Sequence, residues 1–364
     1  MNTLTPTQGP LPIDELVQAL RHSRGFAHKR DISAVAGMLE RALPRGLRDA
    51  TLAEADGVLL GDDCAAIPDH DGYLLFAIEG LVEDFVAHMP WFAGYSAVMV
   101  NLSDIAAMGG RPLAVVDAVW SAGAAQCEPI MQGMAAAACA YGVPIVGGHS
   151  NHHAPRAQLA VAVLGRATAL LSSFHARPGQ DLLMAVDMRG QWEGDYPFWN
   201  ASTGAPSERL RADLALLPEL AESGLCAAAK DISMAGILGT ALMLLECSQT
   251  GARIKLDAIP HPPGHGPQDA PGPWLRWLQA FPSYGYLLSV EPEHTAEVQA
   301  RFRTRGLVCE TIGAVTSGQS VWLTQVGQAG KQEAQLWDFA QEAFIGAPAR
   351  PHPQRRPDHL EAAA

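Results

Sequence analysis

Short apolar runs alternate with longer segments of helical periodicity between residues 31 and 168, and this alternation constrains the fold more than any other feature. The strand-like runs are bounded by turn-forming residues, as in GYLLFAI at 72–78. Because a helix with an apolar side must bury that side, we expect the helices to pack against a sheet. The predicted fold class is α+β (mixed α/β), and its first elements are strand 72–78, helix 93–108, strand 113–120, helix 129–141, strand 143–146 and strand 159–165.

Changes in composition divide the chain into four parts. Residues 1–30 are expected to be an N-terminal arm, 31–168 a first domain and 169–330 a second domain. Residues 331–364 are expected to hold a C-terminal helix and a disordered tail, because the last residues are rich in Pro and charge.

Two segments are open to more than one interpretation. The arm ends in a basic stretch that includes Arg24 and Lys29, which composition alone interprets as solvated. The segment 188–206 is rich in aromatic residues, Gly and polar residues, so we expect a long, ordered loop. Loops of this length are often functional.

The charge of the chain excludes several classes of partner. There are 38 acidic and 25 basic residues, for a net charge of −13, so we expect neither nucleic acid nor an anionic membrane as a partner. Phosphates would have to be bound through a divalent cation or backbone N–H groups. The six cysteines form no C-x-x-C pair, and no signal peptide or apolar stretch of roughly 18 residues is evident. The sequence therefore predicts a cytoplasmic protein with reduced thiols.

Carboxylates gather at three places that suit a metal site. Asp62 and Asp63 follow a glycine, and Glu79 closes the strand 72–78. Asn101 and Asp104 share one face of an otherwise apolar helix, where a buried carboxylate needs a partner or a metal. Mg²⁺ prefers one or two carboxylates together with phosphate oxygens. Alternatives are an ordinary Gly-Asp-Asp turn and Asp104 as the N-cap of a second helix.

Two further motifs place glycines beside polar residues. The turn Gly147-Gly148-His149-Ser150 would let a ligand approach the backbone closely. A zinc site at His149 and its neighbouring histidines is disfavoured by the preceding glycines and by Pro155. The cluster from Lys230 to Gly236 leads into a helix whose first N–H groups could meet an anion. It matches neither a P-loop nor a dinucleotide-binding fingerprint.

The succession of these motifs resembles the AIR-synthase-like superfamily. The motifs, over residues 55–318, are GDDCA, AIEGLVE, NLSDIAAMGGRP, GGHS, KDISMAGILG and PSYGYLLSV. The superfamily includes aminoimidazole ribonucleotide synthetase, thiamine-monophosphate kinase and selenophosphate synthetase. The resemblance implies a two-domain PurM-like architecture, with an N-terminal ATP-binding sheet domain that dimerises and a C-terminal α/β domain. It also indicates an uncharacterised branch of the superfamily.

The resemblance further implies roles for the matching residues. The implied magnesium ligands are Asp62, Asp63, Glu79, Asp104 and Asp231. The implied catalytic residues are Asp62, Asp231 and Lys29, the last neutralising the γ-phosphate if the arm folds over the nucleotide. The implied nucleotide contacts are Asn101, Gly147, Gly148, His149 and Ser150. His149 and Met234 stand where some relatives carry acids.

The implied function is that of an ATP-dependent phosphotransferase or synthetase with ATP and Mg²⁺ as cofactors, a small-molecule substrate and a homodimeric state. The alternative is a catalytically silent nucleotide sensor, favoured by the lost acids but disfavoured by those retained. The acceptor is expected in the cleft between the domains near 188–206. Trp192, Trp199 and Asn200 are candidates for its walls, although a structural tryptophan cluster is the preferred interpretation.

Overall fold

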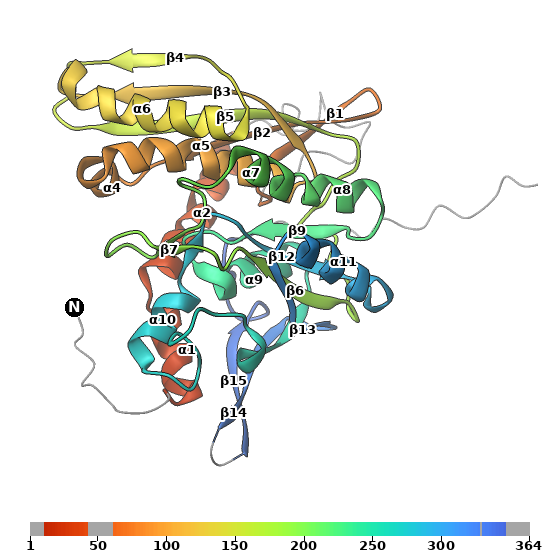
Figure 1. Cartoon of the computed structure of the whole chain (residues 1–364). Helices are drawn as coiled ribbons and strands as arrows, with labels where there is room; N and C mark the ends of the chain where they lie inside the picture. The colour runs from red at the N-terminus through yellow and green to blue at the C-terminus, as the bar shows by residue number, and fades with distance from the viewer. Residues whose placement is uncertain (1–10, 43–60, 328–329, 347–364) are drawn as a thin grey trace, which may run out of the picture.

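The N-terminal domain is built on a five-stranded sheet (Figure 1). A computed structural model of the chain describes residues 11–42, 61–327 and 330–346. The strands lie in the order β1-β2-β5-β3-β4, with β3 and β4 parallel and the other neighbours antiparallel. Their bounds are β1 (Ala65–Asp69), β2 (Gly72–Gly80), β3 (Arg111–Trp120), β4 (Ile145–Asn151) and β5 (Gln158–Ala167). The mixed α/β prediction is confirmed, but β4 continues through the glycines at which it was expected to end.

Helices α5 (Pro90–Ala107) and α6 (Ala124–Tyr141) cover the sheet, after the short helix α4 (Glu83–His88). Gly94 and Gly133 let α5 and α6 approach closely: a Cβ on Gly94 would lie 2.0 Å from the carbonyl oxygen of Ile130. Residues 92–107 of α5 are buried without interruption, because the sheet covers one side and the second domain the other. The helix is continuous, so the alternative with Asp104 as the N-cap of a second helix is wrong.

The opposite face of this sheet carries apolar side chains that no other element of the described residues covers. Phe76 on β2 stands directly opposite Leu164 on β5, and both are exposed. Ile78 and Val116 flank Ala162 in the same way. Such a continuous apolar face is uncommon on a monomer.

The second domain holds a seven-stranded sheet in the order β15-β14-β10-β13-β6-β12-β9. Its strands are β6 (Asp181–Val186), β9 (Ala228–Asp231), β10 (Gly251–Lys255), β12 (Gly285–Val290), β13 (Val308–Thr316), β14 (Ser320–Gly327) and β15 (Gly330–Asp338). The packed helices are α9 (Gly236–Cys247), α10 (Pro271–Leu278) and α11 (Pro292–Thr304), with a 3₁₀ turn at Leu256–Ala258. The central strands β6 and β12 are apolar runs because both faces of each are covered.

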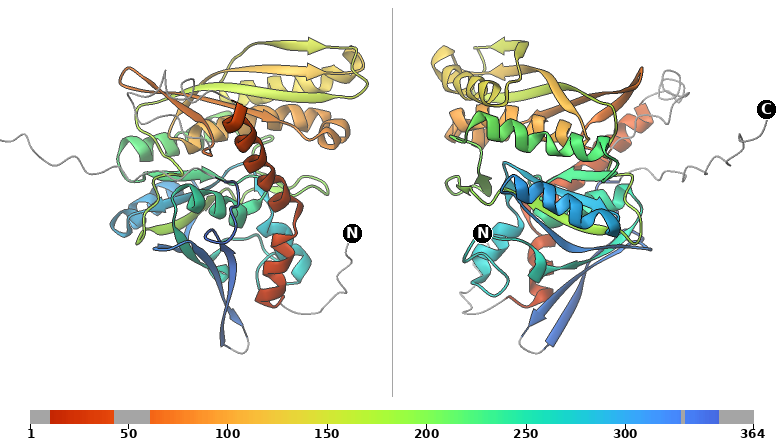
Figure 2. Two further views of the ribbon diagram at one scale, coloured as in Figure 1. Left: turned by 180° about the vertical axis from the view of Figure 1, so that it is seen from behind. Right: turned by 45° about the vertical axis from the view of Figure 1, so that its right-hand side comes forward.

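The two domains are stacked and share a core. Helices α7 (Ser207–Leu214) and α8 (Leu216–Glu222) lie between the two sheets (Figures 1 and 2). Ala106 and Ala107 at the end of α5 pack in one cluster with Leu217 of α8 and Leu183 of β6. This shared core fixes the N-terminal sheet relative to β9. No helix of the described residues is long and apolar enough to span a bilayer.

The N-terminal segment is not a solvated arm. Helix α1 (Ile13–Arg21) buries Leu16 and Leu20 in the core of the second domain, and α2 (Arg24–Ala42) then runs up to the first domain (Figure 2). Phe26 is fully buried, with its ring 5.2 Å from that of Phe344. Arg21 lies 4.4 Å above the ring of Trp337, so one of the basic residues is held by a cation–π contact.

Two other expectations also need correction. Residues 330–338 are strand β15, paired with β14, and not a helix; the expected disordered tail at 347–364 lies outside the described residues. The segment 188–206 is not only loop, since β7 (Gln191–Trp192) and β8 (Phe198–Asn200) form a small sheet with β11 (Phe281–Pro282). β15 pairs with a strand that precedes its segment, whereas β7 and β8 pair with each other and only β11 lies outside 188–206.

Candidate active site

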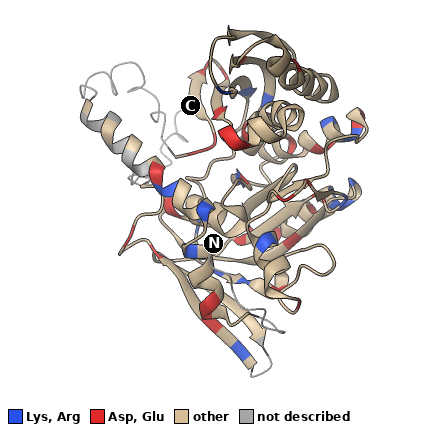
Figure 3. Cartoon of the chain, turned by 90° about the vertical axis from the view of Figure 1, so that its left-hand side faces the viewer, with Lys and Arg blue, Asp and Glu red and all other residues tan. Residues whose placement is uncertain are grey.

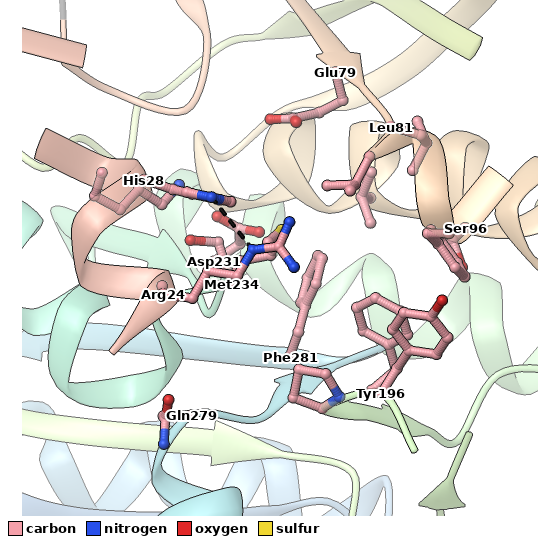
Figure 4. Close-up of a pocket in the computed structure, with 18 of the residues that line it drawn as sticks. Arg24, His28, Glu79, Leu81, Ser96, Tyr196, Asp231, Met234, Gln279 and Phe281 are labelled. Atoms are coloured by element: carbon pink, nitrogen blue, oxygen red, sulfur yellow. Dashed lines mark hydrogen bonds between the residues drawn. The ribbon is translucent and has the colours of Figure 1, made fainter. Parts of the chain in front are cut away.

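A cavity of about 1040 Å³ lies between the two domains. The first domain lines it with β2, α4 and α5, and the second with β8, β9, β11 and α10. Helix α2 supplies a further wall. Figure 4 shows side chains from these elements, with Glu79 and Asp231 facing the space beside Arg24 and Phe281.

Three carboxylates meet at one side of the cavity. Asp63 precedes β1, Asp104 lies on the buried helix α5, and Asp231 ends β9. One carboxylate oxygen from each lies within 4.8 Å of the others, which is a spacing that one cation can bridge. The shared core between α5 and the second sheet brings the residues together, although they are far apart in sequence.

Burial makes this cluster electrostatically unfavourable without a cation. Burial raises the pKa of Asp104 well above its usual range, and Asp231 and Glu79 raise it further. The pKa of Asp231 is raised in the same way, by burial and then by Asp63. Oδ2 of Asp104 is buried and has no hydrogen-bond partner among the described residues. A hard cation such as Mg²⁺ fits this set of oxygen donors.

Lys230 is the cationic partner within the cluster. Its Nζ pairs with Oδ1 of Asp63, while the backbone N–H of Asp231 donates to Oδ2 of Asp63 at 3.3 Å. Burial alone would lower the pKa of Lys230, but attraction to Asp63, Asp62 and Asp231 outweighs it and raises that pKa. Lys230 therefore remains charged at neutral pH. The sequence marked it only as part of a polar cluster.

Asp62 points away from this cluster. Its Oδ2 accepts from the Ser172 hydroxyl at 2.6 Å, and its Oδ1 accepts from the Ser173 hydroxyl at 2.7 Å. The backbone N–H of Ser173 also donates to it, at 3.1 Å to Oδ2. Asp62 thus ties the Gly-Asp-Asp turn to the junction between the domains. The adjacent serines at the junction were the sequence signal for this contact, and sequence reasoning did not use it.

Two other expected residues lie at the cavity. Glu79 reaches it from the end of β2, and burial raises its pKa while Lys29 opposes that rise. Lys29 lines the cavity from α2, and its charge also acts to lower the pKa of Asp231. Figure 3 shows the basic residues following one another along the N-terminal helices. The structure therefore brings Lys29 to the carboxylates.

Gly25 explains why α2 can lie so close to this site. A Cβ at Gly25 would lie 2.4 Å from the carbonyl oxygen of Met234, at the start of the loop into α9. Only a residue without a side chain permits that approach.

The expected nucleotide contacts are not brought to the cavity. Asn101 is fully buried in α5, donates to the carbonyl of Ala97 at 2.7 Å, and does not line the cavity. Residues 147–150 lie on β4, at the edge of the sheet, and none of them lines the cavity. Three strand spacings separate β4 from β2, or about 14 Å. Their proposed contact with a nucleotide stays a prediction.

The tryptophans of 188–206 form a structural cluster, as the preferred interpretation held. Trp192 packs edge-on against Trp199, with centroids 5.5 Å apart, and against Trp277 at 6.1 Å. The Trp199 indole N–H donates to the carbonyl of Asp187 at 2.9 Å. Asn200 caps its own loop by accepting from the backbone N–H groups of Ser202 and Thr203. Trp199 and Asn200 nevertheless line part of the cavity.

Comparison with known proteins bears directly on this arrangement. The N-terminal domain of AIR synthase related proteins matches residues 61–167, and the C-terminal domain of the same proteins matches 189–324. The chain belongs to the AIR synthase related family. This AIR synthase related protein is 43% identical to "Uncharacterized protein sll0787" of Synechocystis sp. over 92% of the chain and 98% of that relative. It is 31% identical to "Uncharacterized protein MJ0640" of Methanocaldococcus jannaschii, over 70% of the chain and 76% of that relative.

A shorter match, at 35% identity, joins the AIR synthase related protein to the thiamine-monophosphate kinase of Pyrococcus horikoshii, over 38% of the chain and 47% of the kinase. Solved structures share the fold. T. maritima PurL complexed with ATP gives a TM-score of 0.66 at 19% identity, over 93% of this chain and 52% of PurL. AaThiL complexed with AMPPCP and TMP gives a TM-score of 0.56 at 18% identity, over 78% of this chain and 94% of AaThiL. The chain thus spans about half of PurL.

Proposed function

We propose that this protein is a Mg²⁺-dependent enzyme that uses ATP to transfer a phosphoryl group to a small molecule in the cavity between its domains. Two relatives that match part of the chain are thiamine-monophosphate kinases. PurL has been solved with ATP and AaThiL with AMPPCP. These likenesses support nucleotide use, and the residues of the cavity support the role of the metal.

The observation that carries the proposal is the convergence of Asp63, Asp104 and Asp231 on one point, where Oδ2 of Asp104 has no hydrogen-bond partner within the described parts of the chain. Carboxylates in such a buried cluster repel each other, and Lys230 neutralises only part of their charge. Magnesium held by these oxygens would neutralise phosphate oxygens and so favour phosphoryl transfer.

The protein's own residues divide the remaining tasks. Lys29 lies at the cavity wall, where its ammonium group can neutralise phosphate charge. Lys230 holds Asp63 in place, and Asp62 positions the turn that carries Asp63. We assign Asp62 a positioning role, because both of its oxygens already accept hydrogen bonds.

The uncovered apolar face of the N-terminal sheet supports the homodimer. Phe76, Ile78 and Leu164 expose apolar surface there, and a second copy of the chain can cover it in a symmetric contact. The contact would also remove these side chains from water.

The proposal is tested by ATP turnover with and without MgCl₂ in the wild type, Asp104→Asn and Glu128→Gln. Glu128 is an exposed carboxylate on α6 and serves as the matched control. We expect turnover to require Mg²⁺, to persist in Glu128→Gln, and to fall about 10²–10³-fold in Asp104→Asn. ATP binding without turnover, even in the presence of a pool of small metabolites, would support the catalytically silent nucleotide sensor instead.

A further inference from the structure

Beside its acidic side, the cavity has a wall of aromatic rings. The rings come from both domains: Phe85 and Phe92 from α4 and α5, Tyr196 from the loop before β8, Phe198 from β8 and Phe281 from β11. Figure 4 shows Phe281 and Tyr196 on one side of the cavity and Glu79 and Asp231 on another. We call these five side chains the aromatic wall.

The rings of the aromatic wall cluster around Phe198, with one stacked pair and several tilted or edge-on contacts. Tyr196 and Phe198 are parallel within 7°, with centroids 5.4 Å apart. Phe85 lies 4.8 Å from Phe198, and Phe281 meets Phe198 edge-on at 6.1 Å. Tyr196, Phe198 and Phe281 are only half-buried, so ring surface remains available to a ligand. A flat ring suits such a surface better than an aliphatic group.

The aromatic wall differs from the neighbouring tryptophan cluster in its polar groups. The tryptophan N–H groups of Trp199 and Trp277 are satisfied by backbone carbonyls. The hydroxyl of Tyr196, in contrast, has no hydrogen-bond partner among the described residues and lies at the cavity (Figure 4). This polar tip is available to a ligand.

Arg24 supplies a positive charge beside the aromatic wall. Its side chain extends from α2 into the cavity, and its Nε donates to Nε2 of His28 at 3.4 Å (Figure 4). The two terminal nitrogens of the guanidinium have no partner within the part of the chain that is described. They form a planar pair of donors of the kind that binds carboxylate or phosphate in two places.

Arg276 fixes the position of Tyr196. Its Nη2 donates to the carbonyls of Gly194 at 2.7 Å and of Tyr196 at 2.9 Å. The same guanidinium lies 4.0 Å above the ring of Trp192. Arg276 is therefore occupied by the protein, whereas Arg24 is free to meet a ligand.

From this arrangement we propose that the phosphoryl acceptor contains a flat aromatic or heteroaromatic ring with an anionic group. The ring lies on the aromatic wall and the anionic group pairs with Arg24. This inference rests on the proposed function, because that function is what makes the ligand a phosphoryl acceptor. The binding preference itself can be measured without turnover.

The test measures the equilibrium binding of small probes to the full chain by ligand-observed NMR. The probes are benzoate and quinoline-2-carboxylate, their neutral amides, and cyclohexanecarboxylate, which keeps the charge but lacks a flat ring. Probes of this size are expected to bind in the millimolar range. We expect benzoate to bind at least about tenfold more tightly than cyclohexanecarboxylate. Equal binding of the two would overturn the assignment of the aromatic wall.

Variants separate the ring from the charge. Tyr196→Leu should weaken all aromatic probes, while Tyr73→Leu, which removes a half-buried tyrosine outside the cavity, should not. Arg24→Gln should weaken benzoate about tenfold and leave benzamide unchanged. Equal loss of benzoate and benzamide would overturn the pairing with Arg24.

Competition with nucleotide distinguishes the acceptor from the adenine ring, which is also flat. We expect benzoate to remain bound at saturating Mg²⁺ and AMPPCP; its displacement would assign the wall to the nucleotide base and overturn the proposal. If no probe binds while Mg²⁺-dependent nucleotide binding persists, the aromatic acceptor is refuted and the proposed function stands. If the probes bind but nucleotide does not, the proposed function fails and the aromatic wall remains a ligand site.

Discussion

Lys230 and Asp63 form an ion pair inside the acidic cluster, with side-chain exposures of 5% and 6%. The pair joins the last strand of the second sheet to the turn before β1 and so connects the two domains. The ammonium group of Lys230 also offsets part of the negative charge of the cluster, since its pKa is raised by attraction to Asp63, Asp62 and Asp231.

Replacing Lys230 should destabilise the protein strongly. Lys230→Met leaves Asp63 buried without its cation, and breaking a buried pair in this way costs about 3–5 kcal/mol. Because Mg²⁺ can take over part of the lost charge, MgCl₂ should restore some of that stability. Urea unfolding with and without MgCl₂ measures both effects. Lys255→Met, at an exposed lysine of β10, is the control and should change little. An unchanged unfolding midpoint in Lys230→Met would contradict the ion pair's role.

Asp62 and Asp104 should respond to the same substitution in opposite ways. Asp62→Asn removes an acceptor from Ser172 and Ser173 and should lower the free energy of unfolding by about 1–3 kcal/mol. Asp104→Asn removes a buried carboxyl group that repels Asp231 and Glu79 when ionised, so it should raise apo stability by about 1 kcal/mol and abolish the stabilisation by Mg²⁺. Thermal melts with and without MgCl₂ check both. Loss of the magnesium effect in Asp62→Asn alone would reverse the assignment.

The magnesium effect should depend on pH. The raised pKa values of Asp104 and Asp231 mean that the folded chain holds protons that the unfolded chain releases. Their contribution to apo stability is therefore fully present below their unfolded pKa values and is lost as pH rises through the folded ones. Magnesium competes with these protons, so its stabilisation should grow with pH. Melting temperatures between pH 5 and 8, with and without MgCl₂, test this. A magnesium shift that is constant over that range would count against the cluster as the site.

A methyl group at Gly25 should disturb the cavity more than the fold. Alanine favours a helix over glycine by about 1 kcal/mol, but its Cβ would lie 2.4 Å from the Met234 carbonyl oxygen and push α2 away. Lys29 and Arg24 would move with it. Gly25→Ala should weaken nucleotide binding about tenfold, measured by calorimetry. Ala27→Ser, on the exposed side of the same helix, should bind as the wild type does. Wild-type affinity in Gly25→Ala would argue against a role for α2.

A charge on the uncovered sheet face should disrupt the homodimer. Ile78 is 65% exposed, and Ile78→Lys places a charge in the middle of that face. Light scattering coupled to gel filtration should show a dimer for the wild type and a monomer for the variant. Val326→Lys, at a residue 64% exposed on β14, is the matched control and should stay dimeric. A monomeric wild type would refute the dimer.

The elements that sequence predicts well are those whose pattern is local. An apolar run or an apolar spacing determines the type of such an element without any contact to another strand or helix, as it does for strands 72–78 and 181–186 and for helix 93–108. β15 does not, because KQEAQLWD contains good helix formers and is a strand only through its pairing with β14. The same holds for the basic stretch of α2, which long-range contacts place beside the cavity.

The sequence predicts which acidic residues belong to the candidate site better than it predicts how their side chains are arranged. All five predicted acids, Asp62 included, line one cavity, while their roles as metal ligands stay predictions. Sequence could not tell which of two adjacent aspartates joins Asp104 and Asp231, because that depends on Ser172 and Ser173, more than one hundred residues away. It also could not show that Phe198 and Phe281 meet.

The role of the carboxylates in holding a metal is tested most directly by the equilibrium binding of ATP, measured by calorimetry with MgCl₂ or with EDTA, in the wild type and in Asp104→Asn. We expect binding that requires Mg²⁺ in the wild type and that is weakened at least about a hundredfold, or 2.7 kcal/mol, in the variant. Equal binding with EDTA, or an unaltered affinity in Asp104→Asn, would contradict the proposal that these carboxylates hold the metal on which nucleotide binding depends.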